Sequence, residues 1–400
     1  MWNLINYTVY PLAFNYVIGT LLKVLQFTAQ VNPNPAKYLI TDEEHKIATN
    51  YEMSKIKLSI VTEFFSFIKD LIMYQNIQQI YYRIPESKYF DKDVLMMLFI
   101  SIFSVVFMIP FNLYSDFVLE ESYGFNKKTL KLFIMDYIKV GIIFVVVAYP
   151  IQYLVFYLIR RFEKFCFYVG VTIICIQGVF IYLHPILIAP LFNKFTPLDK
   201  ELDLYKRIES LAKKFDYSIE KVNICDGSTR SSHSNAYFSG FGKSKRLVLF
   251  DTIVNQMSDD EIMGVVGHEF GHCVLQHIPK LITISSIYQF ISLIFFNRFV
   301  YKTGSYPISI KMIVFSSYFS SFSILFVFLS NFISRKFEKE ADMFSVELGF
   351  GEYLINGLKV LSNKNNVTLV NNWLYSLISF SHPPILERIE FIRKLIAKNK

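Results

Sequence analysis

Residues His268-Glu269-Phe270-Gly271-His272 form an H-E-x-x-H sequence at the end of a stretch that is expected to be helical from about Ser258. Histidines four positions apart project from one face of a helix, so both imidazoles can bind one metal ion. Glu269 follows the first histidine and can address a water molecule at that metal. A zinc ion with an open coordination position lowers the pKa of bound water to about 7, which is chemistry for hydrolysis. The alternative is a helix that carries two histidines by chance.

A catalytic zinc needs a third protein ligand, and the segment Ser334–Asp342 offers one. Glu338 and Asp342 lie four residues apart and hence on one helical face. Glu338 would complete a site of two histidines and one glutamate, and Asp342 would accept the free N–H of a ligating histidine. Glu340 points to a different face and is the weaker candidate. The alternative is a solvated charged face, because the same segment contains Arg335, Lys336 and Lys339.

Two further segments contain residues that can contact a peptide. In residues 230–242, Ala236–Phe238 can form an edge strand that pairs with an extended substrate, although an ordinary hairpin also fits. In residues 381–388, His382 precedes a helix that is expected to end near Asn399, and Arg388 lies in its second turn. These two side chains can stabilise an oxyanion or hold a substrate carboxylate, or they can belong to a capped surface helix.

The elements that position these residues include membrane spans. The chain has 400 residues, of which 53% are hydrophobic and only 18% charged, below the usual quarter for soluble domains. The hydrophobic excess lies in blocks of about 20 residues, the length that crosses a bilayer. We predict seven spans, of which the second is interrupted by three charged residues: Leu4–Phe27, Leu58–Tyr81, Val94–Tyr114, Val140–Ile159, Phe167–Phe192, Leu281–Val300 and Met312–Ser334. The first span lacks the features of a cleaved signal peptide.

The net charge and the cysteines indicate which partners and which compartment fit this chain. The net charge of +8 is spread over loops and the last helix, and nothing resembles a nucleic-acid-binding module. A basic surface facing anionic lipid is the simpler interpretation. The four cysteines form no C-x-x-C pair and fit a reducing compartment. Cys273 adjoins His272 but lies about 100° round the helix from it, so we interpret it as a packing residue.

The spans divide the chain into four regions. Spans one to five lie in residues 1–192, and spans six and seven lie in residues 281–334. Between them, residues 193–280 form a polar region that contains the H-E-x-x-H motif. Residues 335–400 form a second polar region, which contains Glu338 and His382. Two spans separate the polar regions, so both lie on the same side of the membrane, as a shared metal requires. Lysines in the short loops favour the cytosolic side.

Together these residues resemble the type 1 CAAX prenyl proteases, a family of integral-membrane zinc metalloproteases. The similarity spans nearly the whole chain, and its elements occur in the order of the family. It rests on Tyr123–Lys127, His184–Asn193, Ser234–Phe238, Leu249–Thr252, His268–His272, Glu338–Asp342 and Ser381–Pro384. Phe270 and Cys273 stand where members of the family often have Leu and Trp, and the stretch Leu348–Phe380 is short.

The resemblance implies a mainly α-helical polytopic fold, with seven transmembrane helices enclosing a chamber and a zincin-type domain that contains a small β-sheet. It implies one zinc ion per chain, bound by His268, His272 and Glu338, with Asp342 supporting a ligand. Glu269 would be the catalytic acid and base, with His382 and Arg388 at the reacting or C-terminal end of the substrate. The substrate backbone would be held by Asn235, Ala236 and Tyr237.

The function that the resemblance implies is removal of the C-terminal aaX tripeptide from isoprenylated CaaX proteins. The expected location is the endoplasmic reticulum membrane or inner nuclear membrane, with the site facing the cytosol. A monomer in contact with membrane lipid is consistent with the sequence, which leaves the oligomeric state open. Two alternatives remain: a quality-control zinc protease that clears misfolded or translocon-stalled proteins, and a non-catalytic transporter or translocon partner.

Overall fold

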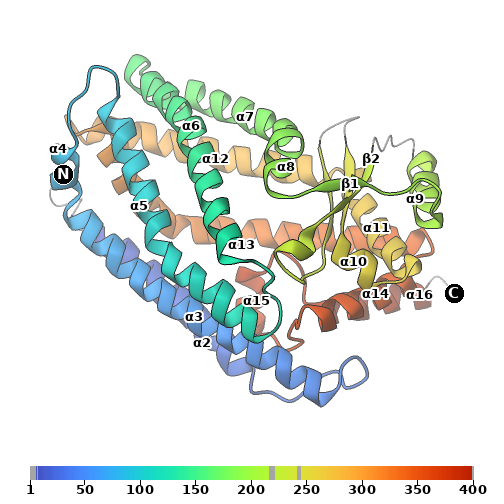
Figure 1. Cartoon of the computed structure of the whole chain (residues 1–400). Coiled ribbons are helices and arrows are strands. Elements are labelled where there is room, and N and C mark those ends of the chain that lie inside the picture. The colour runs from blue at the N-terminus through green and yellow to red at the C-terminus, as the bar shows by residue number, and fades with distance from the viewer. Residues whose placement is uncertain (1–5, 7, 216–220, 241–244, 399–400) are drawn as a thin grey trace.

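The computed structural model describes residues 6, 8–215, 221–240 and 245–398. Long helices form an elongated frame, and a small sheet with shorter helices lies at one end of it (Figure 1). Helix α2 begins at the end of the frame farthest from the sheet, and α16 ends beside the sheet domain. Four residues at the ends of predicted elements or inside them lie outside the described residues: Leu4, Phe241, Gly242 and Asn399.

Six of the described helical segments are long and apolar enough to cross a membrane. The chain is therefore a multi-pass membrane protein. Each segment contains the apolar core of a predicted span, and α5 and α6 each have a proline well inside the helix, at Pro110 and Pro150. The helices are α2 (Val9–Ala29), α5 (Lys92–Tyr114) continued by a π-helical segment (Ser115–Glu120), α6 (Leu130–Arg161), α7 (Phe165–Leu183) continued through His184–Ile188 to α8 (Ala189–Phe192), α12 (His277–Lys302) and α13 (Ile308–Glu347).

The predicted second span is the exception. It lies within α3 (Asp42–Gln75), a helix of 34 residues that is followed by the short α4 (Ile77–Arg83). Helix α3 is long enough to cross a bilayer but too polar to qualify by composition, so the predicted count of seven is not reproduced in the described residues. The three charges that interrupt the predicted span are paired: Glu63 contacts Lys23 of α2 at 2.8 Å, and Asp70 contacts Lys69 at 2.9 Å.

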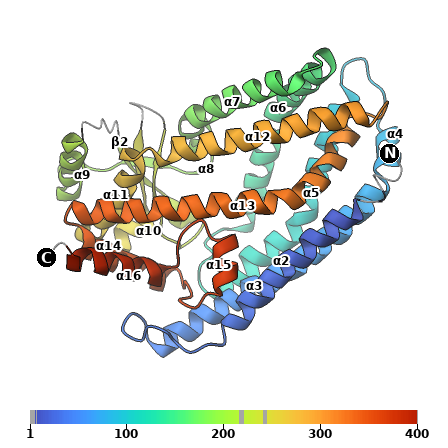
Figure 2. The same ribbon diagram turned by 180° about the vertical axis from the view of Figure 1, so that it is seen from behind.

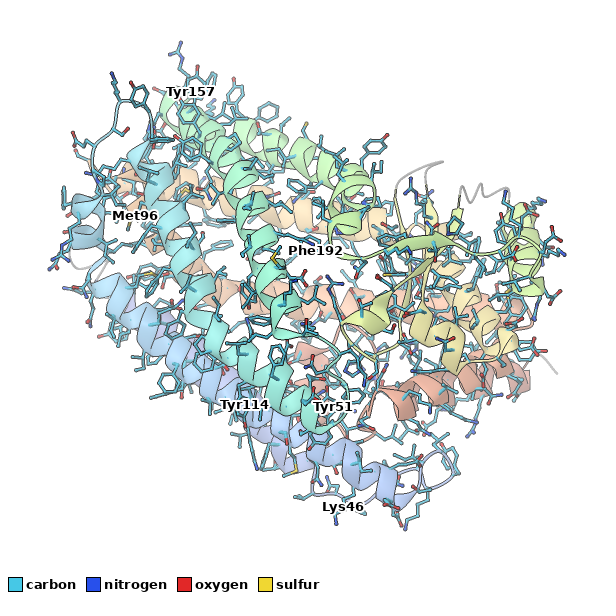
Figure 3. The ribbon with its side chains drawn as sticks, viewed as in Figure 1. Lys46, Tyr51, Met96, Tyr114, Tyr157 and Phe192 are labelled. Atoms are coloured by element: carbon cyan, nitrogen blue, oxygen red, sulfur yellow. The ribbon has the colours of Figure 1, made fainter. Side chains whose placement is uncertain are left out.

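The outer faces of the long helices carry large apolar side chains. On α6, Val140 and Val146 are 50% and 67% exposed in the isolated chain. Figure 3 shows such side chains along the frame, with Tyr157, which is 51% exposed, near its end away from the sheet. Apolar surface of this extent is stable only against lipid or another chain, which agrees with the composition of these helices.

The sheet has four short strands in the order β1-β2-β4-β3. Strand β2 (Lys221–Cys225) pairs in parallel with β4 (Arg246–Phe250), while β1 (Phe195–Pro197) and β3 (Ala236–Ser239) flank them antiparallel. The sequence predicted β2, β4 and the edge strand β3, in which Ala236 pairs with Leu249, but not β1. A one-turn 3-10 helix (Gly227–Thr229) connects β2 toward β3.

Short helices complete the domain around this sheet. The amphipathic helix predicted at Leu202–Phe215 is α9 (Asp203–Lys214), which buries Leu204, Ile208 and Leu211 against the sheet. α10 (Asp251–Gln256) and α11 (Asp259–Val274) follow β4 directly. After α13 come α14 (Gly351–Lys364), α15 (Trp373–Ser379) and α16 (Ile385–Lys398).

Helices α12 and α13 run from the membrane frame into the sheet domain, as the reverse view shows (Figure 2). Helix α11 passes into α12 through a short turn in which Gln276 adopts a left-handed conformation with φ of 56°. Because α13 is a continuous helix of 40 residues, its apolar part and its polar last turns form one rigid element. The frame and the sheet domain are thus joined at the residues that the sequence singles out for metal binding.

Candidate metal centre

Helix α11, which carries the H-E-x-x-H motif, begins with two reciprocal hydrogen bonds. The Ser258 hydroxyl accepts from the Glu261 backbone N–H, and the Glu261 carboxylate accepts from the Ser258 backbone N–H at 2.9 Å. Asp259, Asp260 and Glu261 in the first turn also favour the helix dipole. These local features fix the start of the helix, as predicted, and so fix the direction in which the motif points.

Close helix crossings bring the motif to α13. A Cβ atom at Gly271 would lie only 2.9 Å from the Cα of Ala341 on α13, and one at Gly264 only 2.4 Å from the Leu354 backbone nitrogen on α14. Ser345 on α13 donates a hydrogen bond to the Gly264 carbonyl at 3.0 Å. The absence of side chains at the two glycines therefore lets α11 lie directly against both neighbours.

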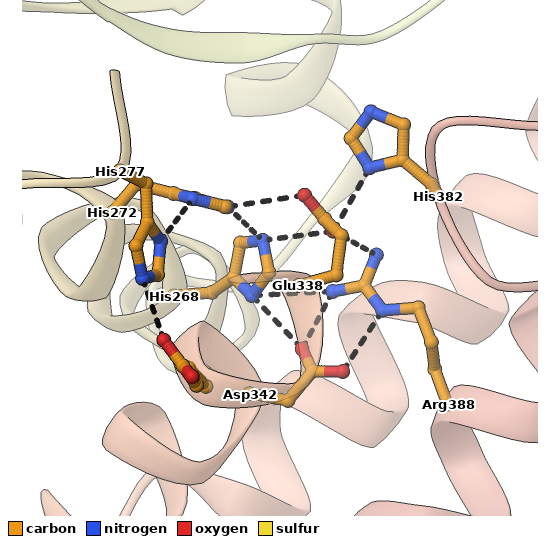
Figure 4. Close-up of polar contacts among 8 residues, drawn as sticks. His268, His272, His277, Glu338, Asp342, His382 and Arg388 are labelled. Atoms are coloured by element: carbon orange, nitrogen blue, oxygen red, sulfur yellow. Dashed lines mark hydrogen bonds and ion pairs between the residues drawn. The ribbon is translucent and has the colours of Figure 1, made fainter. Parts of the chain in front are cut away.

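Three predicted ligands meet at this crossing. His268 Nε2 and His272 Nε2 lie 3.1 Å apart, and Glu338 presents Oε2 at 3.5 Å from the first and Oε1 at 3.2 Å from the second (Figure 4). Each residue offers one atom within 4.8 Å of the others. Zinc–ligand bonds of about 2.0–2.1 Å in a tetrahedral arrangement separate ligand atoms by roughly 3.3 Å, so the spacing fits a metal ion.

The proton positions strengthen this fit. Nδ1 of His268 lies 2.8 Å from Asp342 Oδ1, so it carries the proton and donates to that carboxylate. In a neutral ring, Nε2 is then a bare acceptor, and it faces a second ring nitrogen and a carboxylate. Acceptors gathered so closely repel one another unless a proton or a metal cation lies between them. His268 and Glu338 are 6% and 4% exposed, so bulk water cannot supply that compensation freely.

Asp342 and Arg388 form a buried pair beneath the ligands. Arg388 donates to Asp342 from Nε at 3.0 Å and from Nη2 at 2.6 Å, and Asp342 is fully buried. Arg388 Nη2 also lies 3.2 Å from His268 Nδ1, but that nitrogen donates to Asp342, so we assign the arginine bond to the carboxylate. The structure thus places Arg388 with Asp342 and 3.6 Å from Glu338 Oε2, inside the site rather than at its mouth.

The residues expected around the substrate lie on two sides of this group. His382 is two-thirds exposed on the loop before α16, and its Nδ1 lies 2.8 Å from Glu338 Oε2. Asn235, Ala236 and Tyr237 belong to the edge of the sheet, where the Asn235 carbonyl accepts from the Phe250 backbone N–H. Phe238 of β3 packs edge-on against Phe270 of the motif, with ring centroids 5.1 Å apart. The edge strand is therefore fixed against the metal-binding helix.

Glu269 is half-buried on the same helix, and burial raises the pKa of its carboxyl, opposed by His268 and His272. A carboxylate with a raised pKa is suited to accept and return a proton near neutral pH. A cavity of about 400 Å³ lies beside His382 and is lined by residues of α3 and of the segment before α16, including Glu52, Lys55, Thr368, Asn371 and Ser379–Ile385.

Sequence reasoning missed His277, which lies at the centre, and the contact that connects it to Glu340. His277 Nδ1 lies 2.9 Å from His272 Nδ1, and His277 Nε2 lies 3.1 Å from Glu340 Oε2. Spacing gives no signal for His277, because α11 ends between the two histidines and the chain turns at Gln276. Glu340 faces away from the ligands, as predicted, yet it reaches them through His277.

Comparisons with known proteins agree with this geometry. Residues 22–194 match the family description "CAAX prenyl protease N-terminal, five membrane helices", and residues 199–396 match "Peptidase family M48". The chain is 33% identical to CAAX prenyl protease 1 homolog of Arabidopsis thaliana over 94% of each chain. It is 33% identical to CAAX prenyl protease 1 of Saccharomyces cerevisiae over 90% of this chain and 88% of that protein.

A solved structure has the same fold along its whole length. The crystal structure of S. mikatae Ste24p superposes with a TM-score of 0.91 at 31% identity and covers 98% of both chains. The human CAAX prenyl protease 1 homolog is 32% identical over 76% of this chain and 74% of its own length. Both halves of the architecture, the membrane frame and the sheet domain, are therefore shared with the Ste24p structure.

Proposed function

The chain belongs to peptidase family M48 and, within it, to the CAAX prenyl protease 1 family, and on this premise we propose that it removes the C-terminal aaX tripeptide from isoprenylated CaaX proteins. The observation that carries the proposal is the meeting of His268, His272 and Glu338 within ligand distance, beside the half-buried Glu269. A metalloprotease needs both features, and a non-catalytic transporter needs neither.

One zinc ion held by His268, His272 and Glu338 would polarise the scissile carbonyl and make a water molecule acidic enough to attack it. Glu269 accepts the proton of the attacking water and delivers it to the leaving amine. His382, which is exposed and next to Glu338, faces the developing oxyanion. Asp342 and Arg388 hold His268 and Glu338 in place from below.

The substrate binds along the edge strand in this proposal. An extended peptide pairs with β3, where Asn235, Ala236 and Tyr237 hold its backbone. Strand β3 is at the edge of the sheet and contacts Phe270, the residue after Glu269, through Phe238, so a peptide paired there lies close to the motif helix.

The free carboxylate of the substrate needs a cation, and Arg388 is bound to Asp342. Lys55 is the one lysine or arginine among the described residues that line the cavity beside His382. It pairs with Glu52 at 2.8 Å, and its side chain is 43% exposed. The Glu52 side chain is only 14% exposed and stays paired, but the Lys55 ammonium has three N–H donors and can also donate to a substrate carboxylate. We therefore assign the end of the substrate to this cavity.

The proposed setting is the endoplasmic reticulum or inner nuclear membrane, with the metal centre on the cytosolic side. The loop lysines support this orientation. A prenylated substrate is itself held at the bilayer, since each buried CH₂ of its lipid contributes about 0.8 kcal/mol. A site at the junction of frame and sheet domain meets that substrate without extracting its lipid into water.

The test is release of the aaX tripeptide by the purified full chain from a farnesylated CaaX peptide and from its unprenylated twin, together with zinc analysis. We expect one zinc per chain, cleavage that a chelator abolishes and zinc restores, and preference for the farnesylated peptide. Equal cleavage of both peptides would favour the quality-control protease. No cleavage of either peptide by the zinc-loaded chain would refute the proposal.

A further inference from the structure

A second histidine lies behind the metal-binding face of His272. His277 is the first residue of α12 and is 1% exposed, and its ring stacks on Phe337 with centroids 4.3 Å apart and planes inclined by 4°. The left-handed Gln276 turns the chain so that this ring reaches back to α11. His277 thus lies between His272 and Glu340 of α13, within hydrogen-bond distance of both (Figure 4).

The hydrogen bonds of this group are mutually consistent in only one arrangement of protons when the rings are neutral. His272 directs Nε2 at the other ligands, so its proton lies on Nδ1 and is donated to His277 Nδ1. His277 then carries its own proton on Nε2 and donates it to Glu340 Oε2. Both polar atoms of the buried His277 ring are satisfied, and each bond fixes the tautomer of the ring before it.

We propose that His277 and Glu340 are positioning residues that hold His272 in the tautomer and orientation for metal binding. This inference rests on the proposed metalloprotease function and deepens it. The two histidine ligands are then supported alike: His268 donates directly to Asp342, and His272 donates through His277 to Glu340. Both supporting carboxylates belong to α13, the helix that also supplies Glu338.

The experiment measures zinc affinity of the full chain in detergent, by competition with a chromogenic chelator after metal removal. His277→Phe keeps a ring to stack on Phe337 but removes both nitrogens, and we expect about 10- to 100-fold weaker zinc binding. Glu340→Ala should weaken binding less, and Glu340→Gln, which keeps an acceptor oxygen, should restore affinity to within about threefold of the wild type. Glu347→Ala, an exposed glutamate on the same helix, is the matched control.

The double variant His277→Phe with Glu340→Ala tests the order of the connection. If Glu340 acts through His277, the double variant binds zinc no more weakly than His277→Phe alone. Additive losses would overturn the inference, and so would His277→Phe with affinity within twofold of the wild type. If His277→Phe does not fold, the two Glu340 variants test the proposal. Equal zinc affinity for the wild type and Glu340→Ala would overturn it. Weaker zinc binding in Glu340→Ala that returns in Glu340→Gln would support it.

Zinc affinity is read without turnover, so this inference and the proposed function can fail separately. A wild-type chain that cleaves the farnesylated peptide while His277→Phe binds zinc normally would remove the positioning role and leave the protease assignment intact. Weakened binding in the variants of a chain that cleaves no CaaX peptide would support the positioning role alone.

Discussion

The metal ligands are surrounded by groups that compete for protons. Burial and Arg388 lower the pKa of His268, and Asp342 and Glu338 outweigh them and raise it to about 9 in the metal-free chain. The ring is then protonated at pH 7 and must lose that proton before it binds a metal. We expect zinc affinity to rise at least about tenfold per unit between about pH 7 and 8 and to level off above about pH 9. Chelator competition across this range checks it, and a flat profile would contradict it.

Glu269 is the residue whose role separates binding from catalysis. Glu269→Gln keeps the size of the side chain and removes its basicity, so we expect zinc affinity near that of the wild type. Turnover should fall by about 100- to 10,000-fold, the usual contribution of general acid–base catalysis. Single-turnover cleavage of a farnesylated peptide and zinc analysis of the same sample measure both properties. Cleavage close to the wild-type rate would remove Glu269 from the mechanism.

For individual residues, the sequence predicts which side chains share a face of one helix. The spacing of His268 and His272, and of Glu338 and Asp342, places each pair on one face, and the structure brings the two faces together. The partner of Arg388 and the contact of His277 depend on how separate helices cross. Those crossings are set by packing at Gly264 and Gly271 and by the turn at Gln276, which no local periodicity encodes.

The crossing of α11 and α13 is the element-scale feature on which the site depends. Gly271→Ala adds a methyl group 2.9 Å from the Ala341 Cα, so the helices must separate. We expect a loss of about 1–3 kcal/mol from overpacking, partly offset by the better helix propensity of alanine. Zinc affinity should fall as well, because separation moves the histidines from Glu338. Thermal unfolding with and without zinc measures both effects.

Gly141→Ala on α6 is the matched control, because nothing lies within 4 Å of the added methyl. That substitution should leave zinc affinity unchanged. If Gly271→Ala behaves like Gly141→Ala, the close approach is not what holds the ligands together.

Helix α3 contributes Lys55 to the cavity beside His382. If Lys55 binds the substrate carboxylate, Lys55→Ala should raise KM for a CaaX peptide acid by about tenfold or more, the effect of losing a charged hydrogen bond. The same peptide as a C-terminal amide should be cleaved equally by both proteins. Lys46→Ala, an exposed lysine nearer the start of α3, serves as the control. An equal loss for acid and amide would exclude this role.

Element boundaries followed from sequence where composition and capping agree. The apolar blocks predicted the qualifying spans, and α11 begins next to Ser258, where the sequence predicted its start. Helix α3 departs from the prediction because it is too polar to qualify as a span by composition, although the charges that interrupt it are paired in the structure. Strand β1 was missed because three residues with one proline carry no alternating pattern, and it forms only by pairing with β2.

For the whole molecule, paired charges within the frame imply an interior that water reaches. Glu63 and Asp70 keep side-chain exposures of 27% and 31% between helices that are otherwise apolar. On a chain whose four cysteines are replaced by serine, Glu63→Cys and Asp70→Cys should react with small water-soluble thiol reagents in proteoliposomes. Val146→Cys, on an exposed apolar face of α6, should not react because it faces lipid.

The same preparation tests the orientation. A tag after Lys400 should be accessible from the cytosolic side in intact microsomes. Protected tags, or thiols at residues 63 and 70 that stay inert until unfolding, would contradict a hydrated chamber with a cytosolic metal centre.

Helix α13 carries Glu338 on the continuation of a membrane span, and no proline or glycine interrupts it. At 1.5 Å per residue, Glu338 lies about 45 Å from Ile308, so a tilt of about two degrees around that end displaces the carboxylate by roughly 1.5 Å. Bilayers of different thickness set different helix tilts. Through the tilt of α13, the acyl-chain length of the surrounding lipid therefore affects the position of Glu338 relative to the two histidines. We expect the turnover of the protease to be highest at one bilayer thickness and to fall in thinner and thicker bilayers.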